Sequence, residues 1–325
     1  QLMNKIKIFK SKATILLILI VFITMLIFPQ VTYKGARSGL LLWFMNILPT
    51  LLPFVIISNL MIQLNITKQI SRFLYPVFGR LFRIKPQACY PLLIGFISGI
   101  PMGAKASSDM VAQEEISLEE GNFLFTMCNN YSPVFIMSYI AINQLKLPQI
   151  RYPLFIIIFV SSIVSAMLYR SFQEKRSKGI IYAQSISSSV KEPVSFNFTI
   201  LDNAIMNGFE IITKVGGYII LFSILAQLLN EIAPGNGIFK TFLMGLLEIT
   251  TGISQICKLT INNKIKIVLV ALLTSFGGLS GIAQTKSVLG DTRLSMKSYI
   301  IVKLLAGIIS FFLAFIYVSI FPIIR

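Results

Sequence analysis

The sequence has 325 residues, of which 55% are hydrophobic and only 13% are charged, against roughly a quarter charged in ordinary soluble domains. This composition predicts an all-α polytopic membrane protein. Lys and Arg outnumber Asp and Glu by 29 to 12, but membrane-length apolar runs separate the basic residues. That spacing excludes nucleic-acid binding. It indicates instead that the basic residues lie in cytoplasmic loops, which typically carry an excess of positive charge. There is no histidine and the cysteines, Cys89, Cys128 and Cys257, are isolated, so we expect no metal site, no cofactor and no histidine catalysis.

The N-terminal segment carries four lysines before an apolar run over residues 13–28. The core of a signal peptide is shorter, roughly 7 to 15 residues, and no Ala-x-Ala-like site follows this run. We therefore expect residues 1–39 to be a retained anchor with its N-terminus in the cytoplasm.

The next segments predict a proline-containing span and a basic connector. Pro49 and Pro53 lie within the span over residues 40–61 and predict a kink or a short unwound section. Residues 66–86 combine basic residues with apolar ones at helical spacing, which indicates an interfacial helix or one arm of a hairpin. The acidic cluster over residues 109–120 is expected to be a solvated helix flank.

Four polar interruptions then break apolar segments, at residues 98–105, 129–133, 248–255 and 275–284. A backbone that is not helical at membrane depth must be buried in protein or line a cavity, as it does in secondary transporters. Freed N–H groups at helix N-termini favour an anion, whereas freed carbonyls favour a cation. We therefore predict one substrate site formed by Ser98, Gly99, Gly103, Lys105, Asn129, Asn130, Ser132, Glu248, Thr250, Thr251, Gly277, Gly278, Ser280 and Gln284.

Charged residues in these segments carry further expectations. A carboxylate such as Glu248 costs roughly 2.5 to 3.5 kcal/mol at membrane depth, so it should be paired, protonated or functional. Lys105 and Lys286 reach either the cavity or the membrane interface. Glu210 and Lys214 are spaced i to i+4, which predicts a structural ion pair.

The order of these features predicts two membrane repeats, over residues 40–170 and 201–325, joined by a polar, serine-rich linker over residues 171–200. Residues 96–105 are similar in character to residues 276–286, because each segment is apolar, then rich in Ser and Gly, and ends in lysine. Two repeats with corresponding broken helices are typical of secondary transporters.

Together the four motifs resemble the YlbJ (SpoVV) family of sporulation integral membrane proteins, within the nucleoside-recognition Gate superfamily. They read Gly-Ile-Pro-Met-Gly-Ala-Lys from Gly99, Cys-Asn-Asn from Cys128, Glu-Ile-Thr-Thr-Gly from Glu248 and Phe-Gly-Gly-Leu-Ser from Phe276. The resemblance implies two inverted repeats similar to the core of concentrative nucleoside transporters, with re-entrant hairpins and broken helices that meet at a central site. It further implies transport of dipicolinate, a small aromatic dicarboxylate, during sporulation.

We therefore expect a transporter, not an enzyme, that carries a small organic anion by alternating access between the repeats in a bacterial cell or forespore membrane. Two alternatives remain open: a carrier of a nucleoside-like solute, and a non-transporting scaffold that recruits partners through the linker. Tyr131 and the Gly281-Ile282 pair depart from the family pattern, which leaves the solute open. A proton or sodium is the expected coupling ion, and the sequence sets neither the direction of transport nor the oligomeric state.

Overall fold

The computed structural model describes residues 2–176, 194–235 and 237–321, and every regular element in them is a helix. Among the described residues, five helices are long and apolar enough to cross a membrane. The chain is thus an all-α polytopic membrane protein, as its composition predicts. Most of the predicted linker lies outside the described residues.

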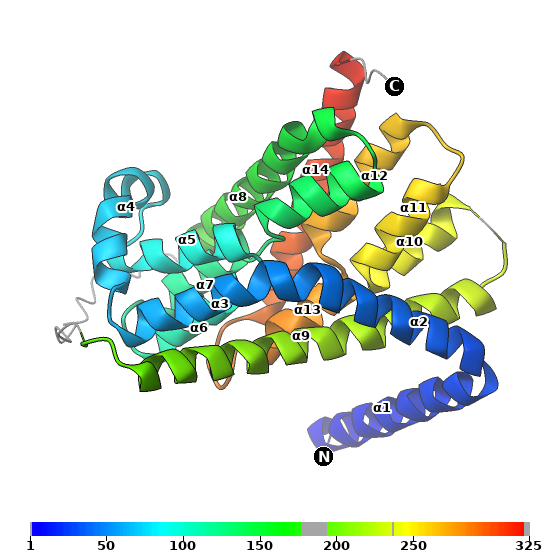
Figure 1. Cartoon of the computed structure of the whole chain (residues 1–325), viewed down its shortest axis with the longest axis horizontal. Coiled ribbons are helices and arrows are strands. Elements are labelled where there is room, and N and C mark those ends of the chain that lie inside the picture. The colour runs from blue at the N-terminus through cyan, green and yellow to red at the C-terminus, as the bar shows by residue number, and fades with distance from the viewer. Residues whose placement is uncertain (1, 177–193, 236, 322–325) are drawn as a thin grey trace.

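The elements follow one another along the chain in two series (Figure 1). The first series is α1 (Leu2–Ile27), α2 (Pro29–Leu42), the π-helical η1 (Trp43–Ile47), α3 (Leu48–Gln63), α4 (Thr67–Phe82), η2 (Pro86–Ala88), α5 (Cys89–Ser98), α6 (Met102–Ala112), α7 (Leu118–Cys128), the π-helical η3 (Phe135–Gln144), η4 (Pro148–Ile150) and α8 (Arg151–Arg176). The second series is α9 (Phe198–Ile232), α10 (Ile238–Leu247), α11 (Ile249–Lys258), α12 (Asn263–Phe276), α13 (Gly278–Ser287) and α14 (Met296–Ile320).

The proline-containing span does not unwind. Pro49 lies in the first turn of α3, where its missing N–H costs nothing, and Pro53 lies inside the same helix. The irregularity is instead the π-helical section η1, just before Pro49. The predicted unwound section is therefore wrong, since α2, η1 and α3 form one continuous helix of 35 residues.

This long helix lies antiparallel along α9, and the pair forms a seam across the molecule (Figure 1). A Cβ at Gly35 would lie 2.8 Å from the Cα of Ile224, and one at Gly39 would lie 2.8 Å from the Cα of Ile220. Small residues thus let the two backbones touch, as in many membrane helix pairs. Trp43 Nε1 donates to the carbonyl of Ile212 at 2.9 Å and fastens the middle of the seam.

Two helical hairpins and two broken helices complete the body, and α5, α10 and α13 among them pack against this seam. In the first hairpin, residues 99–101 separate α5 from α6, and in the second hairpin Glu248 alone separates α10 from α11. The two arms of each hairpin pack on one another. In the broken helices the chain is interrupted at residues 129–132, after α7, and at Gly277, between α12 and α13. All four predicted interruptions are therefore real helix breaks.

The order of these elements is the same in both series: a long helix, a hairpin, a broken helix and a long helix. By this order the break at residues 99–101 corresponds to Glu248, and the break after Cys128 corresponds to Gly277. The sequence similarity between residues 96–105 and 276–286 pairs a hairpin with a broken helix, so it does not follow the helix order. Inverted symmetry between the two series stays a prediction.

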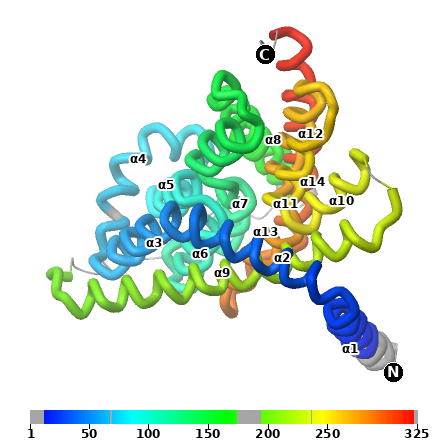
Figure 2. Tube along the Cα trace, turned by 45° about the vertical axis from the view of Figure 1, so that its right-hand side comes forward, coloured from blue at the N-terminus to red at the C-terminus, as the bar shows by residue number. Residues whose placement is uncertain are grey.

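Two peripheral elements extend from this body. α1 projects away from the rest of the chain beyond α2 (Figure 2). In α4 the side chains of Phe73, Val77 and Leu81 are spaced i, i+4 and i+8 and are exposed. This unpartnered apolar stripe fits the predicted interfacial helix.

The acidic cluster is not wholly a solvated flank, so that prediction is wrong for Glu120. Its side chain is 9% exposed, and Oε1 accepts a hydrogen bond from the backbone N–H of Lys85 at 2.8 Å. Ser117 caps α7 by accepting from the Glu120 N–H at 3.1 Å. Glu120 therefore ties the start of α7 to the chain entering the first hairpin.

Candidate functional site

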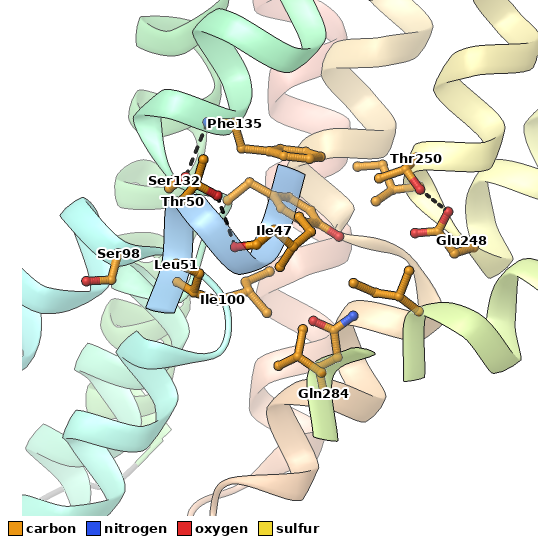
Figure 3. A pocket seen from close by; sticks show the side chains of 14 residues that line it. Ile47, Thr50, Leu51, Ser98, Ile100, Ser132, Phe135, Glu248, Thr250 and Gln284 are labelled. Carbon is orange, nitrogen blue, oxygen red and sulfur yellow. Dashed lines mark hydrogen bonds between the residues drawn. The ribbon is translucent and has the colours of Figure 1, made fainter. Parts of the chain in front are cut away.

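All four helix breaks meet around one cavity of about 40 Å³ (Figure 3). The first hairpin contributes Ser98 and Ile100, the break after α7 contributes Tyr131 and Ser132, and the second hairpin contributes Glu248 and Thr250. The fourth break opens into α13, which contributes Gln284. The remaining wall comes from the seam, through η1, α3 and α9, and from the second hairpin and η3: Ile47, Thr50, Leu51, Val215, Ile219, Ile249 and Phe135.

Direct contacts hold the breaks to one another. The N–H of Ile100 donates to the Asn130 carbonyl at 2.7 Å, which joins the first hairpin to the break after α7. The Tyr131 hydroxyl donates to the Gly277 carbonyl at 3.0 Å, which joins that break to the fourth. A Cβ at Gly278 would lie 3.3 Å from the Gly245 carbonyl oxygen, so α13 begins against the second hairpin. Many polar groups freed by the breaks are thus satisfied within the protein.

Glu248 is the cavity's charged residue and is only 2% exposed. It is the N-cap of α11, and its Oε2 accepts hydrogen bonds from the Thr250 hydroxyl and from the Thr251 N–H, the latter at 2.7 Å. The second carboxylate oxygen points toward the cavity (Figure 3). The helix N-terminus supplies partial positive charge, which favours a carboxylate at this position.

Gln284 and Ser98 contribute differently to the wall. The Gln284 side chain points into the cavity. Its Nε2 donates to Ser280 Oγ at 3.0 Å, and this hydrogen bond fixes the orientation of the amide. The Ser98 hydroxyl points away from the centre of the cavity and has no hydrogen-bond partner. Of these two residues, Gln284 is the one that offers polar atoms to a solute.

Asn129 is fully buried but does not line the cavity. Its Oδ1 accepts from the Ala104 N–H at 3.2 Å in the first turn of α6. Its Nδ2 lies within hydrogen-bond distance of Thr285 Oγ1, at 2.8 Å, and of the Tyr299 hydroxyl, at 3.0 Å. Asn129 therefore connects the first hairpin to α13 and α14.

Asn130 also lies away from the cavity lining and contacts a buried lysine. Lys303 on α14 is 0% exposed, and its Nζ donates to Asn130 Oδ1 at 2.6 Å. The Ser162 hydroxyl donates to the same oxygen at 2.8 Å. No carboxylate in the described chain forms a salt bridge with Lys303. Sequence reasoning missed this residue, although a lysine within the apolar run of α14 is a signal in itself.

The other predicted site residues lie outside the cavity lining. Gly99, Gly277 and Gly278 have φ values of +84°, +92° and +68°, which glycine adopts without strain. Gly103 packs against the backbone of Cys128. Thr251 contributes its N–H to Glu248.

The surface lysines have contacts of their own. Lys105 Nζ lies 2.6 Å from Asp109 Oδ1 and does not line the cavity, and Lys286 is exposed. The predicted pair is confirmed, since Lys214 Nζ lies 2.6 Å from Glu210 Oε1. Within the described residues no group of three or more His, Cys, Asp or Glu could hold a metal ion.

The structure is that of a polytopic membrane protein in which helix breaks meet at a cavity. Comparisons with known proteins also point to an integral membrane protein. Residues 44–143 match the Gate family model, which is described as nucleoside recognition. The chain is also similar to sporulation integral membrane protein YlbJ of Bacillus subtilis (strain 168), with 26% identity over 88% of this chain and 77% of that protein. The resemblance predicted from the four motifs is confirmed. No solved structure matches the chain.

Proposed function

We propose that this protein is a transporter that carries a small organic anion across a membrane of a sporulating bacterium, with dipicolinate as the solute that the family resemblance implies. One observation supports the proposal most: one cavity is lined by residues from three helix breaks and by Gln284 of α13, the helix that begins at the fourth break. Such convergence is typical of secondary transporters. The similar protein is named for sporulation, which supports the setting but not the solute. In this proposal the N-terminus faces the cytoplasm.

The chemistry of the wall suits a flat ring with polar edges. Tyr131 and Phe135 are stacked, with ring centroids 4.9 Å apart, and Ile100, Val215 and Ile219 add apolar surface. The Ser132 hydroxyl and the Gln284 amide can donate to solute carboxylates, whereas the Thr50 and Thr250 hydroxyls already donate to the Asn46 carbonyl and to Glu248 Oε2. This combination of apolar walls and a few polar groups is typical of small-molecule sites.

The size of the cavity supports a mechanism in which the walls move. A volume of about 40 Å³ admits a few water molecules, whereas pockets for ring-sized ligands measure roughly 300 Å³ or more. Loading therefore requires the hairpins to separate from the seam. Alternating access supplies such a motion, because one helix bundle can move against the other around a fixed site.

Uptake by the purified full chain in liposomes tests the proposal. We expect radiolabelled dipicolinate to enter the vesicles faster than uridine and faster than it enters protein-free vesicles. A preference for uridine would instead favour a nucleoside carrier, the second candidate, which is supported by the description of the matching family model. Uptake of neither solute, together with normal sporulation of a Glu248→Ala strain, would overturn both and favour the scaffold.

A further inference from the structure

The cavity presents an electrostatic conflict to the proposed anion. Among the described residues, its wall includes the carboxyl group of Glu248 but neither a lysine nor an arginine. Lys105 is paired with Asp109, and Lys303 is bonded to Asn130 behind the wall. An ionised Glu248 would therefore repel a bound carboxylate, and the low dielectric of a buried site strengthens that repulsion.

In the described part of the chain, the surroundings of Glu248 offer no other charge that would offset this repulsion. Tyr131 and Tyr139 are the titratable side chains near it from the segment packed on α11. The basic residues of the second hairpin, Lys240 and Lys258, lie near the ends remote from its tip. On α9, Glu210 and Lys214 are exposed and paired with each other, and Lys266 of α12 donates to the Cys257 carbonyl.

We propose that Glu248 takes up one proton when the anionic solute binds, so that the solute and a proton are carried together. This inference rests on the proposed function. The proton comes from water on the loading side and bonds to the carboxylate oxygen that faces the cavity. That O–H then donates to a solute carboxylate, while Oε2 keeps its hydrogen bonds from Thr250 and Thr251. When the solute leaves, the proton returns to water on the opposite side.

Linkage fixes the sign of the pH dependence. Because binding takes up a proton, the solute affinity is highest where Glu248 is already protonated and falls as the pH rises. One proton per solute corresponds to about tenfold weaker binding per pH unit. By reciprocity, the solute strengthens proton binding by the same factor.

The test measures dipicolinate binding to the full chain in lipid nanodiscs between about pH 6 and about pH 8, where a solute carboxylate stays ionised. We expect the wild-type affinity to fall by up to about tenfold per pH unit over part of this range. Glu248→Gln, which keeps an oxygen that can accept from Thr251, should bind with little dependence on pH. Glu210→Gln is the matched control and should keep the wild-type slope, since Glu210 is exposed and outside the cavity lining.

Two different results would count against the two proposals. Dipicolinate binding with the same slope in Glu248→Gln as in wild type, or with no slope in wild type, overturns the proton inference and leaves the transporter standing. Failure of wild type to bind dipicolinate at every pH overturns the proposed solute. A monodisperse peak in size-exclusion chromatography shows that each variant is folded.

Discussion

The break after α7 and the tip of the second hairpin both place polar groups deep in the protein, yet they use them differently. After α7, the amides of Asn129 and Asn130 face other protein groups, including Lys303. At the second hairpin, Glu248 faces the cavity with one oxygen. Burial and polarity alone therefore do not identify a solute-binding residue. The first region fastens helices together, and the second presents chemistry to the cavity.

The two regions also differ in the sign of their charge, and the helix ends explain the difference. Glu248 lies at the N-terminus of α11, the positive end of the helix dipole. Lys303 contacts Asn130, two residues beyond the C-terminus of α7, the negative end. Each buried charge thus lies near the helix end of opposite sign, which lowers its cost in a membrane protein.

The largest expected loss of stability comes from a substitution in the second hairpin, and it distinguishes this hairpin from the first. A Cβ at Gly252 would lie 2.1 Å from the Cα of Gly245, so Gly252→Ala should force the arms of the second hairpin apart. We expect a loss of about 3 kcal/mol in stability, the upper end for overpacking, measured by thermal unfolding in detergent. Gly217→Ala is the control, because a Cβ there meets nothing within 4 Å.

In the first hairpin a Cβ at Gly103 would lie 2.9 Å from the Cys128 carbonyl oxygen, a less severe clash with α7. Gly103→Ala should therefore cost less than Gly252→Ala. Equal losses for the two variants would contradict the difference in packing.

A smaller effect tests the fastening role of Asn130. Asn130→Ala removes the oxygen that accepts from both Lys303 and Ser162. Leaving a buried ammonium without its acceptor should cost about 2 to 3 kcal/mol, again measured by thermal unfolding.

Adding Lys303→Met to Asn130→Ala should restore much of that stability, because the charge that lacked an acceptor is gone. If the two losses simply add, the hydrogen bond between Lys303 and Asn130 does not contribute to stability.

The smallest effect concerns Lys105, which the sequence assigned to the substrate site. Its ammonium is bonded to Asp109 and does not line the cavity. Lys105→Met should cost about 0.5 kcal/mol, as expected for a partly exposed pair. Dipicolinate uptake by the Lys105→Met variant should differ less than about twofold from that of the wild type. A much larger loss would show that Lys105 contributes to the solute site.

The positions of the helix breaks were predictable from the sequence, because Gly, Pro and paired polar residues inside apolar runs have few structural solutions in a membrane. The family resemblance implied re-entrant hairpins, but the residues alone do not predict where two helices fold back on each other, since that depends on contacts such as Gly245 with Gly252. The similarity in composition between residues 96–105 and 276–286 likewise does not follow the order of the helices. Two segments can be similar in composition and still belong to different elements, because the order of the elements depends on how the helices pack.

The candidate site was only partly predictable. Ser98, Ser132, Glu248, Thr250 and Gln284 line the cavity, as the breaks suggested. Asn129 has the same polar character but turns to Thr285, far along the chain. Tyr131 was noted only as a departure from the family pattern, yet its ring lines the wall and its hydroxyl reaches Gly277. Side-chain direction at a break depends on the partner helix, which local sequence does not contain.

The glycine contacts between α2 and α9 have a mechanical consequence. Backbones that touch at Gly35 and Gly39 leave no flexible side chains to absorb sliding or rotation between the helices. The seam is therefore expected to stay fixed during transport. It supplies one wall of the cavity through Leu51, Val215 and Ile219. The hairpins opposite would then be the parts that swing, and cross-linking them to the seam should freeze the cavity in one state.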